Sequence, residues 1–285
     1  MRISSPLRYP GGKSVMAGLL QQIRKLNGLG SREIAEPFAG GSGASLTLLY
    51  LEETQRIHLN DADPAIFDFW WTLTNRPKPF IHMLDEVRLD MDEWYQQRAI
   101  YRASARVSRL RRGFSAFYLN RCNRSGIIMN GGPIGGIEQK GKWKIDARFN
   151  RANLKARCEK VAEYGDRICV SGLDGIKFID GLDSDSTMFF IDPPYFVKGS
   201  TLYLNLLTED YHAALATRLK SMAKAAWVVT YDDCPEIRNL YEGWATVHPF
   251  TLRYAAAERR SGREILITPK WMTLPDEQGS AAISW

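Results

Sequence analysis

The sequence predicts an α/β protein: a mostly parallel sheet of the nucleotide-binding type, with a mostly helical segment inserted into it. Two observations support this prediction. A strand, a glycine-rich turn and an apolar helix follow one another between residues 32 and 51, which is how nucleotide-binding βαβ units begin. The alternation of strands and helices then stops near residue 65 and resumes near residue 165. We interpret the segment between them as an insertion.

The composition allows a sizeable core. The chain has 285 residues, 45% of them hydrophobic, which suffices for one large domain or one domain with an insertion. No apolar run approaches the ~20 residues that span a bilayer. Residues 1–6 also lack the apolar stretch of a secretory signal. We therefore expect no membrane contact and a cytoplasmic location.

Cysteine and histidine positions bear on cross-links and metal binding. The four cysteines are scattered, without a Cys-x-x-Cys pair, and the four histidines show no metal-ligand spacing. We therefore expect buried, reduced thiols. We also expect no structural or catalytic metal ion.

The first elements surround two glycine-containing turns. Residues 7–14 read as a loop containing Gly11, Gly12 and Lys13, followed by a helix over residues 15–26. A Walker phosphate loop is not expected, because the first glycine of that motif is missing. The second turn, in residues 32–43, leads into an apolar helix over residues 44–51.

A second strand, over residues 56–59, ends at Asn60 and Asp61. An acid about 20 residues after a glycine turn, at the end of a strand, is placed to bind ribose hydroxyls. The glycines let the backbone approach a ligand closely. Together these features favour a nucleoside-containing cofactor over plain packing.

Residues 65–164 lack the strand and helix alternation. Apolar spacing predicts helices over residues 65–73, 80–89, 91–101 and 106–121, and a helix over 152–163 that Asn150 caps. Aromatic residues recur in these helices, and we interpret them as core: Trp70, Trp71, Trp94, Tyr95, Phe114, Phe117 and Tyr118. Residues 125–149 are rich in glycine, and 127–129 and 143–145 are predicted to pair as a hairpin.

Charge is concentrated in the same segment. Residues 98–157 contain fifteen Lys or Arg and two acids, Glu138 and Asp146, a net charge of +13, which leaves −7 for the rest of a chain that totals +6. A solvated helix face usually mixes both signs, so a polyanion partner is the better explanation. We expect Arg109, Arg111 and Arg112 to contact phosphates.

The alternation then resumes. A strand over residues 167–171 is soon followed by Asp174, and a short apolar strand over 187–191 leads into Asp192. A helix over 209–222 capped by Thr208, a strand over 226–231, and a hairpin of 245–252 with 264–268 complete the prediction. Residues 276–285 are polar and are expected to be loose.

Asp192-Pro193-Pro194-Tyr195 is the clearest indication of chemistry. The prolines fix the backbone as it leaves the strand, so Asp192 and Tyr195 are held where open α/β sheets bind ligands. The tetrapeptide resembles the Asp-Pro-Pro-Tyr motif of amino-methyltransferases that act on bases in DNA. In that chemistry the carboxylate and the Pro193 carbonyl accept the amino hydrogens of adenine. By the same resemblance, Tyr195 is expected to stack on a base turned out of the duplex, with Phe196 as a second apolar wall.

With these motifs placed, the chain resembles a Dam-type DNA adenine methyltransferase of the alpha group. The loop at residues 7–14, the glycine turn, the insertion and the tetrapeptide occur in that family's order, over most of residues 7–270. The resemblance implies a Rossmann-like sheet that binds S-adenosylmethionine, with an inserted, mostly helical DNA-recognition domain. It also implies methyl transfer to the exocyclic amino group of adenine in a short duplex sequence, by base flipping and direct displacement.

The resemblance also assigns residues. The cofactor-binding positions that it implies are Tyr9, Lys13, Glu36, Phe38, Gly40, Asp61, Asp174 and Asp192. The catalytic positions are Asp192, Pro193, Pro194 and Tyr195. Asn120, Arg121, Asn123 and Arg124 precede the predicted hairpin, in the region where relatives contact DNA. Gly175 follows Asp174 where relatives often have an aromatic residue.

The predicted organisation has three parts. Residues 1–65 and 165–275 form the catalytic domain, residues 66–164 the inserted target-recognition domain, and residues 276–285 a tail. Double-stranded DNA is the expected partner, and the expected state is a monomer or a weak dimer.

Three alternatives remain at this point. The first is a methyltransferase acting on the amino group of cytosine or on RNA, although Asp rather than Ser before the prolines favours adenine, and RNA enzymes usually lack a large insertion here. The second is a catalytically silent DNA-binding protein on the same scaffold, which would not need an intact tetrapeptide. The third, an NAD-dependent oxidoreductase, explains neither the tetrapeptide nor the basic insertion. The target sequence and any restriction partner stay open.

Overall fold

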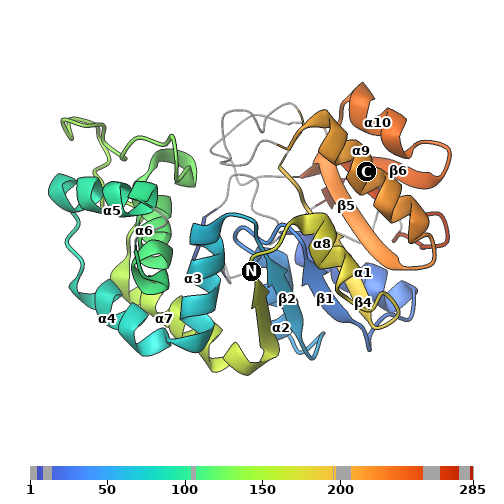
Figure 1. Cartoon of the computed structure of the whole chain (residues 1–285), viewed down its shortest axis with the longest axis horizontal. Helices are drawn as coiled ribbons and strands as arrows, with labels where there is room; N and C mark the ends of the chain where they lie inside the picture. The colour runs from blue at the N-terminus through green and yellow to red at the C-terminus, as the bar shows by residue number, and fades with distance from the viewer. Residues whose placement is uncertain are drawn as a thin grey trace.

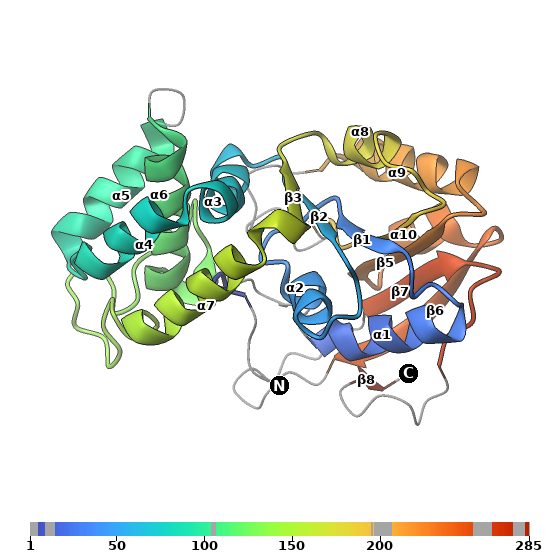
Figure 2. The ribbon, with the colours of Figure 1, turned by 90° about the horizontal axis from the view of Figure 1, so that it is seen from below.

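The computed structural model describes residues 5–8, 15–103, 107–194, 196, 207–252, 264–275 and 283–284. A sheet lies at the centre, and a group of helices extends from one end of it (Figure 1). Seen from below, further helices lie on both faces of the sheet (Figure 2). This arrangement confirms the predicted α/β class.

In the described part of the chain the sheet has eight strands, in the order β3-β2-β1-β4-β5-β7-β6-β8. The strands are β1 (Glu33–Glu36), β2 (Ile57–Asn60), β3 (Ile168–Ser171), β4 (Thr187–Ile191), β5 (Ala226–Asp232), β6 (Ala245–Leu252), β7 (Glu264–Pro269) and β8 (Ile283–Ser284). Neighbours from β3 to β5 are parallel, whereas β7 is antiparallel to both β5 and β6. The predicted final hairpin of β6 and β7 is therefore confirmed.

The end of the chain departs from the prediction of a loose tail. The two residues of β8 pair antiparallel with Thr251 and Leu252 of β6. Backbone pairing uses N–H and C=O groups that every such residue carries, so a polar composition does not reveal it.

Strand residues alternate between two apolar layers. On β4, Met188 and Phe190 belong to one core cluster, and Phe189 and Ile191 to the other. Figure 2 shows α1 and α2 on one face of the sheet and α8 and α9 on the other. The helices of these layers are α1 (Met16–Leu26), α2 (Gly43–Tyr50), α8 (Gly175–Asp180), α9 (Glu209–Ser221) and α10 (Pro235–Tyr241). The central strands are buried on both faces, which explains their continuous apolar runs.

Two of these helices, α8 and α10, are missing from the sequence prediction. They have six and seven residues, too few for a helical apolar pattern to stand out. Local signals mark their starts instead. The Asp174 side chain accepts hydrogen bonds from two backbone N–H groups of α8, and Pro235 occupies the first turn of α10.

The helices at the end of the sheet match the predicted insertion helices closely. They are α3 (Pro64–Asn75), α4 (Pro77–Glu86), α5 (Met91–Ala103), α6 (Arg109–Cys122) and α7 (Arg151–Glu163). The side chains of Asp63, Ser108 and Asn150 cap α3, α6 and α7. Helix α3 can approach α6 because Gly113 has no side chain: a Cβ atom there would lie 2.6 Å from Phe69 N.

The predicted hairpin of residues 127–129 and 143–145 is wrong. Residues 124–126 form a short 3₁₀ helix, η3 (Arg124–Gly126), and turns without strands follow as far as Asn150. Side-chain amides hold these turns: Asn123 Nδ2 donates to Ile127 O at 2.7 Å, and Gln139 Nε2 donates to Ile134 O at 2.8 Å. These bonds satisfy carbonyl groups that a strand ladder would otherwise pair.

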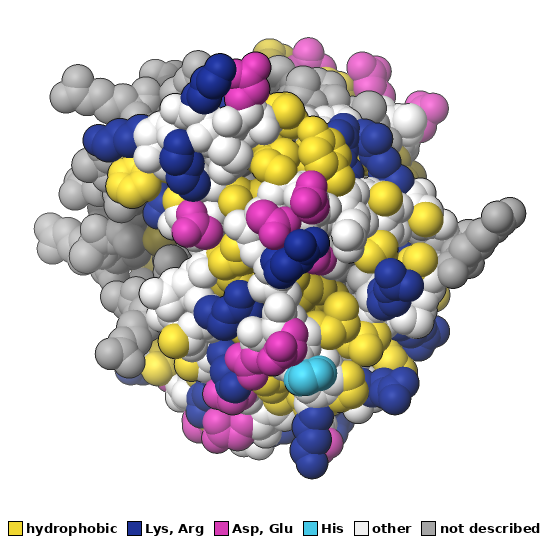
Figure 3. Space-filling model, turned by 90° about the vertical axis from the view of Figure 1, so that its left-hand side faces the viewer, with side chains coloured by type: hydrophobic (Ala, Val, Ile, Leu, Met, Phe, Trp, Pro, Cys, Tyr) yellow, Lys and Arg dark blue, Asp and Glu magenta, His cyan; other side chains and the backbone are white. Residues whose placement is uncertain are grey.

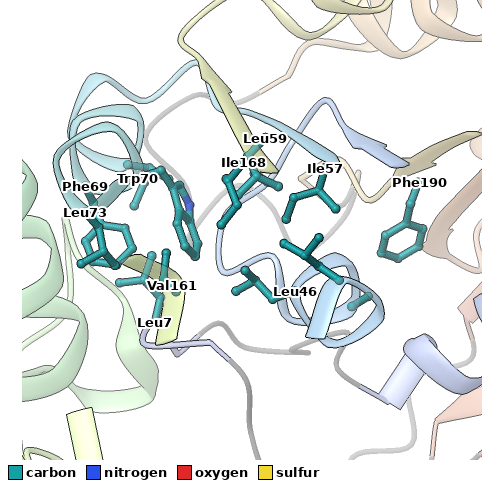
Figure 4. Close-up of a cluster of buried hydrophobic side chains, with 14 of the residues drawn as sticks. Leu7, Leu46, Ile57, Leu59, Phe69, Trp70, Leu73, Val161, Ile168 and Phe190 are labelled. Atoms are coloured by element: carbon teal, nitrogen blue, oxygen red, sulfur yellow. The ribbon is translucent and has the colours of Figure 1, made fainter. Parts of the chain in front are cut away.

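The insertion helices and the sheet share one core. The larger cluster contains Leu46 and Phe190 of the sheet region together with Phe69, Leu73 and Val161 of the helices. Figure 4 shows these side chains in one continuous run. Of the aromatic residues predicted as core, the buried ones are Trp70, Trp94, Phe114, Phe117 and Tyr118, whereas Trp71 is partly exposed and Tyr95 is exposed.

The four cysteine positions all lie in the described part of the chain, and each is a free thiol. Three are buried as predicted, but Cys169 is exposed on β3, at the edge of the sheet. Within the described ranges, no helix is both long enough and apolar enough to cross a membrane.

Candidate active site

The side chain of Asn60 ties together the carboxyl ends of β1, β2 and β3. Its Nδ2 atom donates to Pro37 O and Leu173 O, each at 2.9 Å. Its Oδ1 atom accepts from Ser171 Oγ and Leu173 N, each at 2.8 Å. An amide has two donors and two acceptor lone pairs, so these bonds satisfy a fully buried group and fix where the loops leave the strands.

The glycine turn after β1 binds the predicted ribose-binding acid directly. Gly40 has a φ of 44°, which glycine adopts without strain, and its N–H donates to Asp61 Oδ2 at 2.9 Å. The N–H of Asp63 donates to Asp61 Oδ1 at 2.9 Å. Burial, reinforced by the charge of Asp63, raises the pKa of Asp61 to about 7. The turn and the acid therefore form one hydrogen-bonded unit.

Two residues of the insertion helices contact this unit. Trp70 Nε1, on α3, donates to Gly40 O at 2.9 Å. The hydroxyl of Tyr101, on α5, donates to Asp63 Oδ2 at 3.1 Å. The helical end of the molecule thus helps to hold the glycine turn.

Glu36 is the last residue of β1 and is buried. Its Oε1 atom accepts from Ser45 N at 3.2 Å and also from Ser45 Oγ. Burial raises the pKa of Glu36 to about 7; the hydrogen bonds from Ser45 oppose that rise, and the negative charge of Asp192 adds to it. The parallel register sets Ala35 beside Phe189, so Glu36 ends β1 and Asp192 follows the end of the neighbouring β4; two acids so placed favour a cationic ligand.

Phe38 and Gly175 explain a departure from the family pattern. A Cβ atom at Gly175 would lie 2.6 Å from Phe38 Cζ, so the ring of Phe38 covers this glycine. Tyr211 meets Phe38 edge-on, with the ring centroids 6.4 Å apart. An aromatic residue in place of Gly175 has no room while Phe38 lies here. Asp174 stands beside them as the cap of α8.

Asp192 follows β4 at the same strand edge. The parallel register sets Ile191 beside Val229, which brings Asp192 next to Thr230 of β5. Thr230 Oγ1 donates to Asp192 Oδ1 at 2.5 Å. Pro193 is buried and Asp192 is partly exposed, so the carboxylate is anchored and still reachable.

The predicted cofactor and catalytic residues that the structure describes lie where neighbouring parallel strands end. Gly40 and Glu36 belong to the end of β1, Asp61 follows β2, Asp174 follows β3 and Asp192 follows β4. Three further predicted residues lie outside the described residues: Tyr9, Lys13 and Tyr195.

The arginines predicted to contact phosphates differ in their surroundings. Arg112 Nε lies 2.5 Å from Oδ2 of Asp68, whose side chain is fully buried. Arg109 Nε lies 3.7 Å from the other oxygen of Asp68, and its guanidinium covers the ring of Trp71. Arg111 is exposed. Arg112 and Arg109 therefore pair with a protein carboxylate, and Arg111 presents its charge to solvent.

Asn120 and Arg121 are buried and hold the N-terminal segment. Asn120 Oδ1 accepts from Arg8 N at 2.6 Å, and its Nδ2 donates to Arg8 O at 2.5 Å. Arg121 Nε donates to Pro6 O at 2.6 Å. Burial, reinforced by the charges of Arg157 and Arg8, lowers the pKa of Arg121 to about 9. These side chains position the segment that enters the predicted cofactor loop, so a direct DNA contact by them stays a prediction.

Asn123 and Arg124 differ in their exposure. Asn123 is fully buried and accepts from Trp94 Nε1 at 2.7 Å. Arg124 is exposed at the start of the turns. Further along, Lys142 covers the ring of Trp143, whose exposed fraction is 66%. Exposed cationic and aromatic groups thus gather in the turns, while the amides near them support the backbone.

The helical end of the molecule does not present one uniform positive patch. Figure 3 looks at this end and shows Lys and Arg side chains interspersed with acidic and apolar ones on the face drawn. Ion pairs such as Lys155 with Asp85, at 2.6 Å, account for part of this mixture. A count of charges along the sequence therefore overstates the charge that a partner would meet.

Sequence reasoning missed three residues that support the site: Asn60, Thr230 and Asp232. Each is a polar residue at the carboxyl end of a buried strand, and that is the signal that could have found them. Phe196 N donates to Asp232 Oδ1 at 3.2 Å, so Asp232 holds a residue that lies shortly after Asp192. Only the strand register shows which segments these polar residues meet.

The mostly parallel sheet, with the antiparallel β7 between β5 and β6 and acids at the carboxyl ends of the parallel strands, agrees with the Rossmann-like methyltransferase sheet that the sequence resemblance implies. The model of the D12 class N6 adenine-specific DNA methyltransferase family matches residues 9–256. The chain therefore belongs to that family: it methylates adenine in DNA at N6 and uses S-adenosylmethionine as cofactor.

A comparison with curated proteins gives no significant match. Among the described residues, no group of three or more His, Cys, Asp or Glu side chains could hold a metal ion.

Proposed function

We propose that this methyltransferase acts on an adenine turned out of a short duplex site, and that Asp192 accepts a hydrogen bond from its amino group. The observation that carries the proposal is the position of Asp192. It follows β4 at the carboxyl ends of the parallel strands, where the glycine turn also lies, and its carboxylate is anchored by Thr230 and partly exposed. The target and the cofactor would then meet at this edge.

The carboxylates at the carboxyl ends of the parallel strands match the hydrogen-bond donors and positive charges of S-adenosylmethionine. The cofactor offers ribose hydroxyls and amino groups as donors and carries two positive charges, and the edge offers carboxylates. Asp61 would hold the ribose hydroxyls, Asp174 the cofactor adenine, and Glu36 would face the positive charges. When bound, the cofactor supplies an electrophilic methyl group on a sulfonium. Tyr9, Lys13, Phe38 and Gly40 are the remaining proposed contacts.

On the target side, Asp192 makes a poor nucleophile reactive. The lone pair of the adenine amino nitrogen is conjugated with the ring. Asp192 and the Pro193 carbonyl, by accepting its two hydrogens, draw the nitrogen towards a tetrahedral state. The amino hydrogens become more acidic as the nitrogen gains positive charge, so the bond to Asp192 strengthens in the transition state. Tyr195 would stack on the base, with Phe196 as a second wall.

Residues 66–164 are proposed as the target-recognition part. The exposed cations Arg111, Arg124 and Lys142 suit phosphate contacts, and the exposed Trp143 suits contact with the duplex. A monomer suffices for this arrangement, because one chain supplies both the acidic edge and the exposed cations. A weak dimer is compatible with it.

Asp192→Asn tests the proposed mechanism. Asn keeps the shape of Asp but is a neutral, weaker acceptor. We expect single-turnover methylation to fall by about a hundredfold or more, on the order of 3 kcal/mol. Affinity for the duplex should stay nearly unchanged, because the exposed cations of the insertion supply it. Asp210→Asn, an exposed acid on α9, is the matched control and should behave as the wild type.

Two outcomes would contradict the proposal. Near-normal turnover of Asp192→Asn would remove Asp192 from the chemistry. Equal activity on single-stranded and duplex substrates would remove the proposed duplex site. Fluorescence of 2-aminopurine at the target position, which rises when a base leaves the stack, measures base turning independently of methyl transfer.

A further inference from the structure

Two described residues of the segment after β4, Asp192 and Phe196, are hydrogen-bonded to strand β5. Thr230 Oγ1 donates to Asp192 Oδ1 at 2.5 Å, and Asp232 Oδ1 accepts from Phe196 N at 3.2 Å. Thr230 and Asp232 are two residues apart and therefore point to the same face of the sheet. Tyr231, between them, points to the other face and packs in the second core cluster. One face of β5 thus holds both Asp192 and Phe196.

Strand register explains why Thr230 reaches Asp192. The last parallel pair of β4 and β5 is Ile191 with Val229, so the next residues along, Asp192 and Thr230, are neighbours on adjacent strands. Thr230 is fully buried and is preceded by the apolar residues Trp227 and Val228. Most buried hydroxyls are hydrogen-bonded, and the partner of Thr230 Oγ1 is the carboxylate of Asp192.

We propose that Thr230 is the positioning residue for Asp192. The terminal torsion of an aspartate is broad, so a carboxylate with no fixed donor samples many orientations. The Thr230 hydroxyl holds Oδ1 against β5 and so fixes the plane of the carboxylate that would accept from the amino group of adenine. The inference rests on the proposed role of Asp192 as acceptor, and it adds a residue that touches neither target nor cofactor.

Thr230→Val removes the hydroxyl and keeps the branched shape. We expect the single-turnover rate at saturating DNA and cofactor to fall by roughly ten- to a hundredfold, the loss that follows a misplacement of about 1 Å. Dissociation constants for duplex DNA and for S-adenosylhomocysteine should change by less than about twofold, because Thr230 contacts neither. Thr230→Ser keeps the hydroxyl and should restore most of the rate.

Thr268 offers a matched control. It is a fully buried threonine on the neighbouring strand β7, and its Oγ1 has no hydrogen-bond partner among the described residues. Thr268→Val should leave both the rate and the unfolding temperature close to wild type. If Thr230→Val does not fold, Thr230→Ala removes the same hydroxyl with less bulk beside Asp192.

The combination with Asp192→Asn separates this inference from the proposed function. If Thr230 acts through Asp192, adding Thr230→Val to Asp192→Asn should lower the rate by less than about twofold further. A slow Asp192→Asn enzyme with a normal Thr230→Val enzyme overturns the positioning role alone. A fast Asp192→Asn enzyme overturns the role of Asp192 and the inference with it. Equal rates for Thr230→Val and Thr230→Ser would assign the effect to packing and also overturn the inference.

Discussion

Charged side chains are buried both at the carboxyl ends of the parallel strands, called the sheet edge below, and at the helical end of the molecule. The two groups differ in sign and in the partners that they have. At the sheet edge, Asp61 and Glu36 accept hydrogen bonds from backbone N–H groups and a serine hydroxyl. At the helical end, buried Arg121 donates to a backbone carbonyl, and Arg112 pairs with the buried Asp68. The edge gathers acids at one place, and the helices commit their cations to the protein itself.

The difference shows that the surroundings of a charge, more than its number, decide what it can bind. Burial raises the pKa values of Glu36 and Asp61 to about 7, which means that their surroundings favour the neutral form over the charged form. A cationic ligand relieves that preference. Arg112 and Arg121 already bond to groups of the protein itself. The cations proposed to contact DNA are therefore exposed ones, such as Arg111, Arg124 and Lys142.

The largest effect that tests this comparison is expected at Arg112. Arg112→Ala leaves the carboxylate of Asp68 buried without its 2.5 Å partner, so the free energy of unfolding should fall by roughly 3 kcal/mol. Arg111→Ala, one residue away and exposed, should change it very little. Urea unfolding of both variants measures the contrast.

A second substitution sharpens the same test. In the Arg112→Ala background, Asp68→Asn removes the uncompensated charge and should restore part of the stability. If Arg112→Ala lowers DNA affinity and leaves stability intact, Arg112 serves the partner after all, and the distinction between the two regions fails there.

A smaller effect is expected from Glu36, through pH. Its folded-state pKa is about 7 against 4.5 for an unperturbed glutamate, so between these values the folded protein binds more protons than the unfolded chain. Stability of the cofactor-free enzyme should therefore fall as pH rises from about 4.5 to 7, by on the order of 2 kcal/mol from this group. Glu36→Gln cannot ionise and should lack this part of the pH dependence.

The measurement is the difference in unfolding free energy between wild type and Glu36→Gln from pH 5 to pH 8. The variant should gain relative stability as pH rises. A constant difference would show that folding does not raise the pKa of Glu36, which would contradict the description of buried acids at the sheet edge.

The smallest effects are expected at the exposed cations of the helical end. Each phosphate contact that is lost lowers the slope of log affinity against log salt by about 0.9. Arg124→Ala and Lys142→Ala should each show such a change and weaken binding to all duplex sequences alike. Lys220→Ala, an exposed lysine on α9, is the control. Unchanged slopes for both variants would exclude these cations from the DNA interface.

The candidate residues at the carboxyl ends of the parallel strands could be predicted, because the sequence patterns that indicate them are short and continuous. A strand, a glycine turn and an acid at a fixed distance identify Gly40 and Asp61, and the prolines identify Asp192. The supporting residues Asn60 and Thr230 could not be predicted, because their partners belong to strands that only the fold brings beside them. For that reason the sequence indicates candidate site residues and hides the residues that orient them.

The helical end was harder to predict for a related reason. Helical spacing identified α3 to α7, since burial repeats along a helix. The turns after Arg124 have no such period: amides of Asn123 and Gln139 decide their course, and the apolar pattern of residues 127–129 suggested strands instead. Nor does composition separate an exposed arginine such as Arg111 from its paired neighbour Arg112.

The core that the sheet and helices share limits how this protein can evolve a new target sequence. Phe69 and Val161 pack in the same cluster as Leu46 and Phe190 (Figure 4). Recombination that exchanged residues 66–164 for the corresponding piece of a relative would join two apolar faces shaped for other partners. Point substitution at exposed positions of the turns, such as Lys142, Trp143 and Lys144, disturbs no such face. With residues 66–164 in the proposed role of target recognition, new specificities in this lineage are expected to arise by gradual divergence of those exposed positions, with the helices beneath them inherited unchanged.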